Sequence, residues 1–342
     1  MNKRRLSGKT VLVTGGAGFM GSNFIHQLLA AVPDVRVINL DLLTYAGNPE
    51  NLKGVPQARY SFVEGDICDT ALVTKLFAKS DYVVNFAAES HVDRSIHGGA
   101  RTFMRTNVEG VLSVLEALRA SEGIELMIHI STDEVWGDLP LKSSKRFNEQ
   151  SPFKPSSPYA ASKAGGDLLA HAYHRTYGVP VIVTHATNNF GPRQYPEKMI
   201  PFFITQAQRG KPVTLYGDGK NRRDWLFVED HSRAIQALLE RGVAGEAYGI
   251  SQQGAEPTNR WMAELILREL GKSASLITYI KDRPGHDLRY AVDSSKIRKL
   301  GWKPRVTLEA GIKRTIEWYE EHGAWLENVL ARTAKVNPHI GV

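Results

Sequence analysis

The stretch Thr10–Ser22, TVLVTGGAGFMGS, decides the fold of this chain. It begins with β-branched residues, and the pattern predicts a strand over Lys9–Thr14. Gly15, Gly18 and Gly21 follow, and the apolar residues after them have helical spacing. Glycines at this place let the chain turn tightly and let the backbone approach a pyrophosphate at the helix N-terminus. The stretch therefore predicts the first strand–turn–helix unit of a dinucleotide-binding sheet.

An acidic residue follows at the spacing that such a unit requires. Asp41 lies twenty residues after Gly21 and ends a predicted strand over Val35–Leu40. A carboxylate at this place binds a ribose diol. Leu42 and Leu43 follow it, so no cation is at hand for a 2′-phosphate. NAD is therefore favoured over NADP.

Strands and helices continue to alternate after Asp41, which predicts a doubly wound parallel sheet of the α/β Rossmann class. Further strands are predicted over Tyr60–Val63, Tyr82–Phe86, Leu126–Ile130 and Val181–Thr184, and further helices over Thr102–Leu118, Tyr159–Tyr177 and Leu308–Glu321, with a last apolar segment over Trp325–Leu330.

The composition narrows the class of protein. The 342 residues are 42% hydrophobic, and the formal net charge of +7 is spread along the chain, which argues against a nucleic-acid partner. Cys68 is the single cysteine, which excludes an internal disulfide framework and a cysteine metal cluster and suits a reducing compartment. The apolar run Val11–Val13 is too short for a signal peptide or a membrane span. We expect a cytoplasmic protein with no metal and no membrane partner.

Two further motifs carry groups that can move protons. Ser131–Glu134 follows the predicted strand Leu126–Ile130, so two hydroxyls and two carboxylates lie at the carboxyl end of a strand, where α/β sheets bind ligands. Tyr159 and Lys163 are four residues apart and share one helix face. Acid, base, phenol and lysine together indicate a site for proton transfer.

These motifs resemble those of the extended short-chain dehydrogenases that act on nucleotide sugars and, within them, the dTDP-glucose 4,6-dehydratases. The likeness runs from about Lys9 to about Tyr319. It is carried by Gly15-x-x-Gly18-x-x-Gly21, Asp41, Ala87–Ser95, Thr132–Val135, Tyr159-x-x-x-Lys163, Asn188–Pro192, Pro196–Lys198, Arg223–Trp225 and Asp282–His286. Among these motifs, the Asp133–Glu134 pair best distinguishes the dTDP-glucose 4,6-dehydratases from related families. Sister epimerases usually lack both carboxylates, whereas sugar decarboxylases and GDP-mannose dehydratases tend to have Ser in place of Asp133.

The resemblance implies a role for each catalytic group. Oxidation of C4 by NAD makes the C5 proton of a glucose acidic, and returning the hydride to C6 regenerates the cofactor. Tyr159 would accept the proton of the C4 hydroxyl, with its pKa lowered by the Lys163 ammonium and by the nicotinamide. Thr132 would hydrogen-bond the C4 oxygen. Glu134 would take the C5 proton, and a protonated Asp133 would donate to the departing C6 hydroxyl.

The resemblance also implies two sets of binding residues. The residues expected at NAD are Gly15, Gly18, Phe19, Met20, Gly21, Asp41, Leu42, Thr44, Asp66, Ile67, Phe86, Ala87, Ala88, Ser90, Thr106, Tyr159, Lys163 and Asn189. The residues expected at the nucleotide sugar are Ser90, Thr132, Asn188, Lys198, Met199, Thr214, Tyr216, Arg223, Arg283 and His286.

The domain division and the assembly also follow from the resemblance. We expect an NAD-binding Rossmann domain over 1–187 and a smaller mixed α/β domain over 188–334, mainly for the nucleotide sugar, with a strand or helix exchanged back to the first. Residues 335–342 would form a tail. The predicted helices Thr102–Leu118 and Tyr159–Tyr177 would form a four-helix contact in a homodimer.

Two departures from the family pattern leave the nucleotide open. Trp136 stands where the family usually has Tyr, and Gln252–Glu256 replaces a Gly-rich, Asn-containing segment near the nucleotide. UDP-glucose or another nucleotide hexose stays an alternative substrate. A nucleotide-sugar 4-epimerase is a rival activity that would not need Asp133. A non-catalytic NAD-sensing module would typically lose Tyr159 or Lys163, and both are present.

Overall fold

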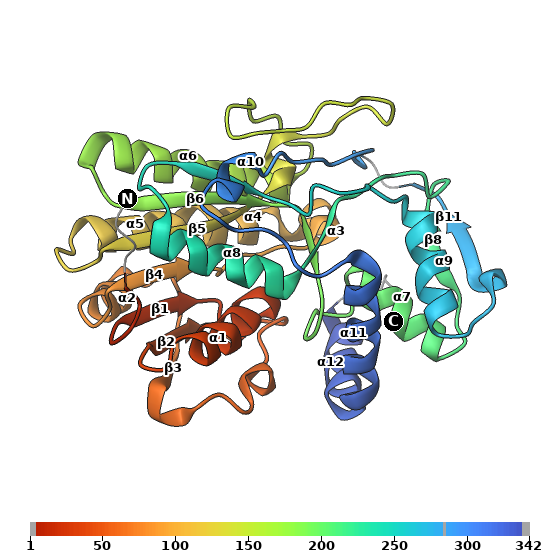
Figure 1. Cartoon of the computed structure of the whole chain (residues 1–342), viewed down its shortest axis with the longest axis horizontal. Coiled ribbons are helices and arrows are strands. Elements are labelled where there is room, and N and C mark those ends of the chain that lie inside the picture. Colours follow the sequence, from red (N-terminus) through yellow and green to blue (C-terminus); the bar gives the residue numbers. More distant parts are fainter. Residues whose placement is uncertain (1–4, 283–284, 337–342) are drawn as a thin grey trace.

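A seven-stranded sheet lies at the centre of the computed structural model, which describes residues 5–282 and 285–336 (Figure 1). Every neighbouring pair in this sheet is parallel. In spatial order the strands are β10 (Ala247–Ile250), β6 (Val181–Ala186), β5 (Leu126–Thr132), β4 (Tyr82–Asn85), β1 (Thr10–Thr14), β2 (Arg36–Asp41) and β3 (Tyr60–Glu64). The doubly wound parallel sheet predicted from the sequence is confirmed.

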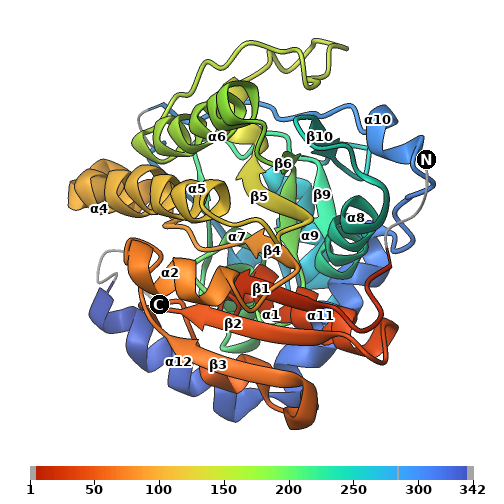
Figure 2. The same ribbon diagram turned by 90° about the vertical axis from the view of Figure 1, so that its left-hand side faces the viewer.

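Helices cover both faces of the sheet (Figure 2). Neighbouring residues along a strand point to opposite faces. Val11 and Val13 therefore pack in one core with Phe24 and Leu238, while Leu12 between them packs in the core on the other face. The first face carries α1 (Phe19–Ala31) and α8 (Val228–Arg241), and the second carries α2 (Thr70–Phe77), α5 (Val111–Arg119) and α6 (Pro158–Tyr177). Strands buried on both faces explain the continuous apolar runs in the sequence.

The chain returns to this sheet after residue 187. Strand β10 pairs with β6 at the edge, and helix α8 packs beside α1. The sequence prediction had not assigned a strand to Ala247–Ile250. Its four residues are all buried, so their short apolar pattern alone does not distinguish a strand from a buried turn of helix.

A second core lies beside the sheet, at the right of Figure 1. Phe203, Leu215, Met262, Ile312 and Trp325 are among its buried side chains. It is built mainly from α7 (Met199–Gln208), α9 (Asn259–Glu269), α11 (Leu308–Glu321), α12 (Gly323–Val336) and the parallel pair β8 (Val213–Tyr216) and β11 (Ile277–Ile280). A third small sheet pairs β7 (Asn188–Phe190) with β9 (Trp225–Phe227), and the short helices are α3 (Val92–Arg94), α4 (Ala100–Met104) and α10 (Ser295–Arg298).

The predicted helix Thr102–Leu118 and the apolar segment Trp325–Leu330 both differ in detail from the structure. The segment predicted as one helix over Thr102–Leu118 consists of α4, a π-helical stretch over Arg105–Gly110, and α5. Gly110 lies so close to Ile67 that an added Cβ would be 2.6 Å from its Cδ1 atom. Helix α12 extends to Val336, beyond the predicted end of the apolar segment at Leu330. Residues 337–342 of the predicted tail lie outside the described residues. In the part of the chain that is described, no helix has the length and apolar character needed to span a membrane.

Candidate active site

The turn between β1 and α1 is closed tightly by glycine. Gly15 has φ +68°, and a Cβ on it would lie 2.6 Å from the backbone nitrogen of Ala87. A Cβ on Gly21 would lie 2.4 Å from the carbonyl oxygen of Gly15. Larger residues would therefore push the turn, the end of β4 and α1 apart. The N-terminus of α1 has no side-chain cap, so its first amides remain available to an anion.

Asp41 closes β2 beside this turn and is buried. One carboxylate oxygen accepts a hydrogen bond from the Ala17 amide and the other from the Leu43 amide, both at 2.8 Å. Burial raises the pKa of Asp41, and the two amides oppose that rise. The carboxylate thus fixes the turn and retains lone pairs for a further donor.

A cavity of about 310 Å³ runs along the carboxyl ends of these strands. All of the residues predicted at NAD line it: Gly15, Gly18, Phe19, Met20, Gly21, Asp41, Leu42, Thr44, Asp66, Ile67, Phe86, Ala87, Ala88, Ser90, Thr106, Tyr159, Lys163 and Asn189. The five predicted catalytic residues line the same cavity: Thr132, Asp133, Glu134, Tyr159 and Lys163.

The two carboxylates lie directly after β5. Thr132 is the last residue of the strand, and Asp133 and Glu134 open a 3₁₀ turn that ends at Trp136. Asp133 is only 1% exposed. One of its oxygens accepts from the Thr132 hydroxyl at 3.4 Å, and the other has no hydrogen-bond partner among the described residues. Burial, and next the charge of Glu134, raise the pKa of Asp133 well above its ordinary value, which favours the protonated acid.

Tyr159 and Lys163 come from the first turns of α6. This helix begins after Ser157, whose hydroxyl accepts from the Ala160 amide at 3.1 Å. Tyr159 from α6 and Thr132 at the end of β5 line the same cavity, and the Thr132 side chain lowers the pKa of Tyr159. Lys163 is buried, and its Nζ donates to the carbonyl oxygen of Ile130 at 2.7 Å.

The expected lowering of the Tyr159 pKa by Lys163 together with the nicotinamide stays a prediction, because without NAD the pKa of Tyr159 is raised. Burial raises the pKa of Tyr159, and the charge of Glu134 raises it further. Burial also lowers the pKa of Lys163 to about 8, against the opposing charge of Asp167. Both groups lie deep in the protein, where desolvation disfavours their charged forms. A reactive phenolate at Tyr159 therefore needs positive charge beyond that of Lys163.

Four of the predicted substrate residues line the cavity. They are Ser90, Thr132, Asn188 and Lys198. Lys198 Nζ donates to the Ser90 carbonyl at 2.6 Å. Asn188 and Asn189 follow β6, and the side-chain oxygen of each is buried without a hydrogen-bond partner in the described part of the chain. Such unpaired oxygens are costly unless a ligand donates to them.

Five other predicted substrate residues, all of them described, do not line this cavity: Met199, Thr214, Tyr216, Arg223 and His286. The ring of Tyr216 on β8 contacts His286 edge-on, with centroids 5.9 Å apart, and His286 Nδ1 lies 2.6 Å from Asp282. Arg223 is buried and donates to the Asp287 carbonyl at 2.8 Å. Arg283 lies outside the described residues.

The cavity also contains acidic and polar residues that the sequence prediction had not named as site residues, among them Glu89, Ser131, Thr187, Gln194, Tyr195 and Glu197. Glu89 pairs with Arg94 at 3.1 Å, and Glu197 accepts from Tyr45 at 2.8 Å. Both glutamates lie within motifs that carry the family resemblance. Their position beside Ser90 and Lys198 is the signal that could have identified them.

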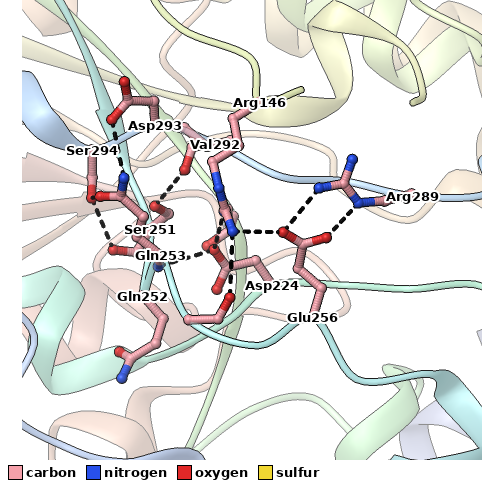
Figure 3. Close-up of polar contacts among 12 residues, drawn as sticks. Arg146, Asp224, Ser251, Gln252, Gln253, Glu256, Arg289, Val292, Asp293 and Ser294 are labelled. Atoms are coloured by element: carbon pink, nitrogen blue, oxygen red, sulfur yellow. Dashed lines mark hydrogen bonds and ion pairs between the residues drawn. The ribbon is translucent and has the colours of Figure 1, made fainter. Parts of the chain in front are cut away.

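The two departures from the family pattern differ in burial: Trp136 is buried, whereas in Gln252–Glu256 only Glu256 is buried and Gly254 and Ala255 are exposed. Trp136 is buried with its ring 4.6 Å from that of His185. Figure 3 shows Glu256 between two arginines: it pairs with Arg289 and, at 2.9 Å, with Arg146. The structure therefore gives both departures contacts within the chain, and neither lines the cavity at the sheet edge.

Comparison with known proteins gives the family. The model of a family described as GDP-mannose 4,6 dehydratase matches residues 12–315. The chain is 50% identical over 323 residues to a dTDP-glucose 4,6-dehydratase of Streptomyces niveus, which covers 93% of this chain and 94% of that protein. A crystal structure of the dTDP-glucose 4,6-dehydratase from Streptomyces venezuelae with NAD bound has 49% identity and a TM-score of 0.89, covering 94% and 99% of the two chains.

A UDP-glucose 4-epimerase from Thermotoga maritima is more distant, at 30% identity and a TM-score of 0.82, covering 91% of this chain and 99% of the other. The shared sheet therefore extends to the epimerases, while the higher identity lies with the dehydratases. The chain belongs to the dTDP-glucose 4,6-dehydratase family of the extended short-chain dehydrogenases.

Proposed function

We propose that this chain is a hydro-lyase that converts dTDP-glucose to its 4-keto-6-deoxy product with NAD as cofactor. One observation carries the proposal. A buried Asp133 and its neighbour Glu134 lie on the same cavity as Thr132, Tyr159 and Lys163. An epimerase needs the last three groups and has no use for a buried carboxylic acid beside them.

The cavity has the features that NAD requires. The backbone at Gly15 leaves room that a Cβ would fill, and Asp41 presents a carboxylate at the end of β2. The unpartnered Asn189 oxygen can accept from a carboxamide, as the amide group of a nicotinamide requires. When bound, NAD supplies a positively charged ring that takes a hydride from C4 of the sugar and later returns it to C6.

Tyr159 and Thr132 handle the C4 oxygen. Thr132 orients that oxygen, and Tyr159 accepts its proton during oxidation and holds it on the hydroxyl. Both side chains line the same cavity, which supports this pairing. Burial raises the pKa of Tyr159. Tyr159 can therefore accept this proton only when a positive charge lies near its hydroxyl.

Asp133 and Glu134 carry out the elimination. Glu134 removes the proton from C5, which the C4 ketone makes acidic, and Asp133 donates its proton to the C6 hydroxyl as it leaves as water. Afterwards Glu134 returns a proton to C5. The raised pKa of Asp133 supports the assignment of acid and base, since two neighbouring carboxyl groups divide these tasks when only one stays protonated.

The substrate's diphosphate and sugar would bind near Ser90, Asn188 and Lys198, all of which line the cavity. The base would extend toward Thr214 and Tyr216, with Met199, Arg223, Arg283 and His286 as further substrate residues. The T-shaped contact between Tyr216 and His286 supports a common site for these two. We also propose that residues 1–187 chiefly bind NAD and that 188–334 chiefly bind the nucleotide sugar.

The four-helix homodimer and the cellular location are part of the same proposal. Apolar side chains are exposed along the two expected helices: Met104 is 49% exposed, Leu112 38% and Leu168 60%. A second copy of these helices would remove that surface from water. The single cysteine suits work in the reducing cytoplasm.

The proposal is tested by incubating the purified protein with NAD and either dTDP-glucose or UDP-glucose, followed by mass spectrometry. Loss of one water from dTDP-glucose is the expected result. Faster loss from UDP-glucose would assign the alternative nucleotide. An isomer of unchanged mass would mean epimerisation and would overturn the roles of Asp133 and Glu134.

A further inference from the structure

Behind Lys163, three ionisable side chains form a buried cluster that the proposed reaction does not use. Asp167 comes from α6, His129 from β5 and His185 from β6, and each is at most 1% exposed. The cluster lies on the inner side of the catalytic groups, because Asp167 is one helical turn beyond Lys163 on the same helix.

Both oxygens of Asp167 face side chains of the sheet, and one of them is hydrogen-bonded. One oxygen accepts from the Ser131 hydroxyl at 2.7 Å and lies 3.1 Å from His185 Nε2. The other lies 3.4 Å from His129 Nε2. Asn85 Nδ2 lies 3.1 Å from His129 Nδ1 and donates to it, which leaves the proton of a neutral ring on Nε2, toward Asp167. The carboxylate thus joins α6 to two neighbouring strands.

These contacts fix the two catalytic elements relative to each other. Lys163 donates to the carbonyl of Ile130, and Asp167 accepts from Ser131, the next residue of β5. Thr132 follows immediately. Two successive residues of the strand are therefore clamped to α6 just before the strand presents Thr132 to Tyr159.

The cluster also sets the charge beside Lys163. Burial alone would raise the pKa of Asp167, but the neighbouring His129 and His185 outweigh it and hold that pKa well below its usual range. Burial, and next the charge of Lys163, lower the pKa of His129 to about 4, so this histidine stays neutral. Asp167 therefore places a fixed negative charge near the buried ammonium of Lys163, where water cannot screen it.

We infer that Asp167 is a positioning residue of the active site, which clamps α6 to the end of β5 through Ser131 and holds the charge of Lys163 opposite the reacting groups. The inference rests on the proposed function, because it concerns the step that Tyr159 and Thr132 carry out. Nothing in the reaction requires Asp167 to touch the substrate.

The titratable groups around Asp167 come from every element packed on it. His129 faces it from β5 and His185 from β6, and its own helix contributes Tyr159, whose pKa the charge of Asp167 raises, together with Lys163 and His171. His129 stays neutral near neutral pH, because burial lowers its pKa to about 4. The change in charge that affects activity near neutral pH is therefore that of Lys163, whose pKa of about 8 is supported by Asp167.

The test compares Asp167→Asn with a matched control, Asp230→Asn. Asp230 is also fully buried and accepts two backbone hydrogen bonds, from Arg305 at 2.8 Å and Val306 at 3.0 Å, but it does not line the cavity. Asp167→Asn is expected to lower kcat about tenfold with KM unchanged, and to move the alkaline loss of activity down by about one pH unit. The direction follows because removing the negative charge lowers the pKa of Lys163. Asp230→Asn should lower Tm and leave the pH profile in place.

A readout independent of turnover separates this inference from the proposed function. NMR of protein labelled with ¹³C-lysine, with the Lys163 signal identified by Lys163→Met, should show its titration about one pH unit lower in Asp167→Asn. Ser131→Ala removes one clamp without changing charge, so it should lower kcat and leave that titration unchanged. It also serves if Asp167→Asn does not fold. An unchanged Lys163 titration in Asp167→Asn, or full kcat in Ser131→Ala, would overturn the inference. An inactive unsubstituted protein would instead overturn the proposed function.

Discussion

The carboxyl edge of the main sheet and the region around Tyr216 and His286 were both predicted as parts of one site, and the structure treats them differently. At the sheet edge, all five catalytic residues and all of the predicted cofactor residues line one cavity. Around Tyr216, the side chains contact one another and do not line it. Both regions carry family motifs, so similarity of sequence does not explain the difference.

The difference lies in how each region is constructed. The sheet edge is formed by parallel strands whose register is fixed by backbone hydrogen bonds, such as Thr132 opposite Ala186. The carboxyl ends of strands paired in this way meet at one edge of the sheet, because backbone hydrogen bonds and not side chains set their positions. Tyr216 belongs instead to a two-stranded sheet over the second core, and His286 follows in a loop. The main sheet positions the residues proposed for catalysis, while the residues proposed for nucleotide binding lie on loops and over the second core.

The largest expected effect is on activity and tests the residues at the carboxyl edge of the main sheet. Glu134→Gln keeps the shape of the side chain and removes the base for the C5 proton, so kcat should fall at least about a hundredfold. Product formation by mass spectrometry measures it. Glu64→Gln, an exposed change at the end of β3, is the matched control and should keep full activity. Comparable kcat for the Glu134 variant and the control would remove Glu134 from the reaction.

The next effect tests the glycine turn that supports the sheet edge. Gly15→Ala should lower the free energy of unfolding by about 1–3 kcal/mol and prevent NAD from being retained, because the added Cβ meets the Ala87 backbone at 2.6 Å. Gly8→Ala is a matched control, since Gly8 has a similar φ of +75° with nothing within 4 Å of an added Cβ. Thermal unfolding and the amount of bound NAD are measured for both variants. A larger loss in Gly15→Ala would show the effect of the clash with Ala87 beyond that of backbone strain. Equal losses in both variants would show that strain alone matters.

A smaller effect is expected in the second region. Tyr216→Ala should raise KM for the nucleotide sugar about threefold to tenfold and leave kcat nearly unchanged, because the ring would bind the part of the substrate that does not react. Tyr279→Ala on the neighbouring strand, a residue 50% exposed, provides the control. If KM is the same for both variants, the region around Tyr216 does not bind the substrate. The carboxyl edge of the main sheet would then be the only one of the two regions that belongs to the site.

The smallest effect is a gain in stability. Burial raises the pKa of Asp133, so its ionisation opposes folding at every pH above the ordinary carboxyl range, and the penalty disappears as the pH falls through that range. Asp133→Asn removes this penalty and should raise Tm by about 2 °C at pH 7 while activity is lost. The gain should vanish below about pH 3, where the carboxyl is protonated in both states. A lower Tm at pH 7 would mean that the carboxylate is stabilised by a partner in the folded protein.

The sequence by itself determined the local features of the site. The glycine turn, Asp41 at its distance from Gly21, and the four-residue spacing of Tyr159 and Lys163 each depend on a short stretch of backbone. Their geometry is set by the strand or helix that contains them. The alternation of strands and helices also determined the parallel sheet, since right-handed crossovers leave few other arrangements.

Only the tertiary structure decided which side chains surround the glycine turn, Asp41, Tyr159 and Lys163, and how deeply these residues are buried. Strand order brings His129 on β5 and His185 on β6 to Asp167 on α6, and burial determines that Lys163 donates to Ile130 and leaves the pKa of Tyr159 raised. Burial also packs Trp136 against His185, where it does not line the cavity. Desolvation and packing depend on all neighbours at once, and those neighbours come from segments up to 56 residues apart in the chain. No local pattern contains that information, because it exists only once the sheet has assembled.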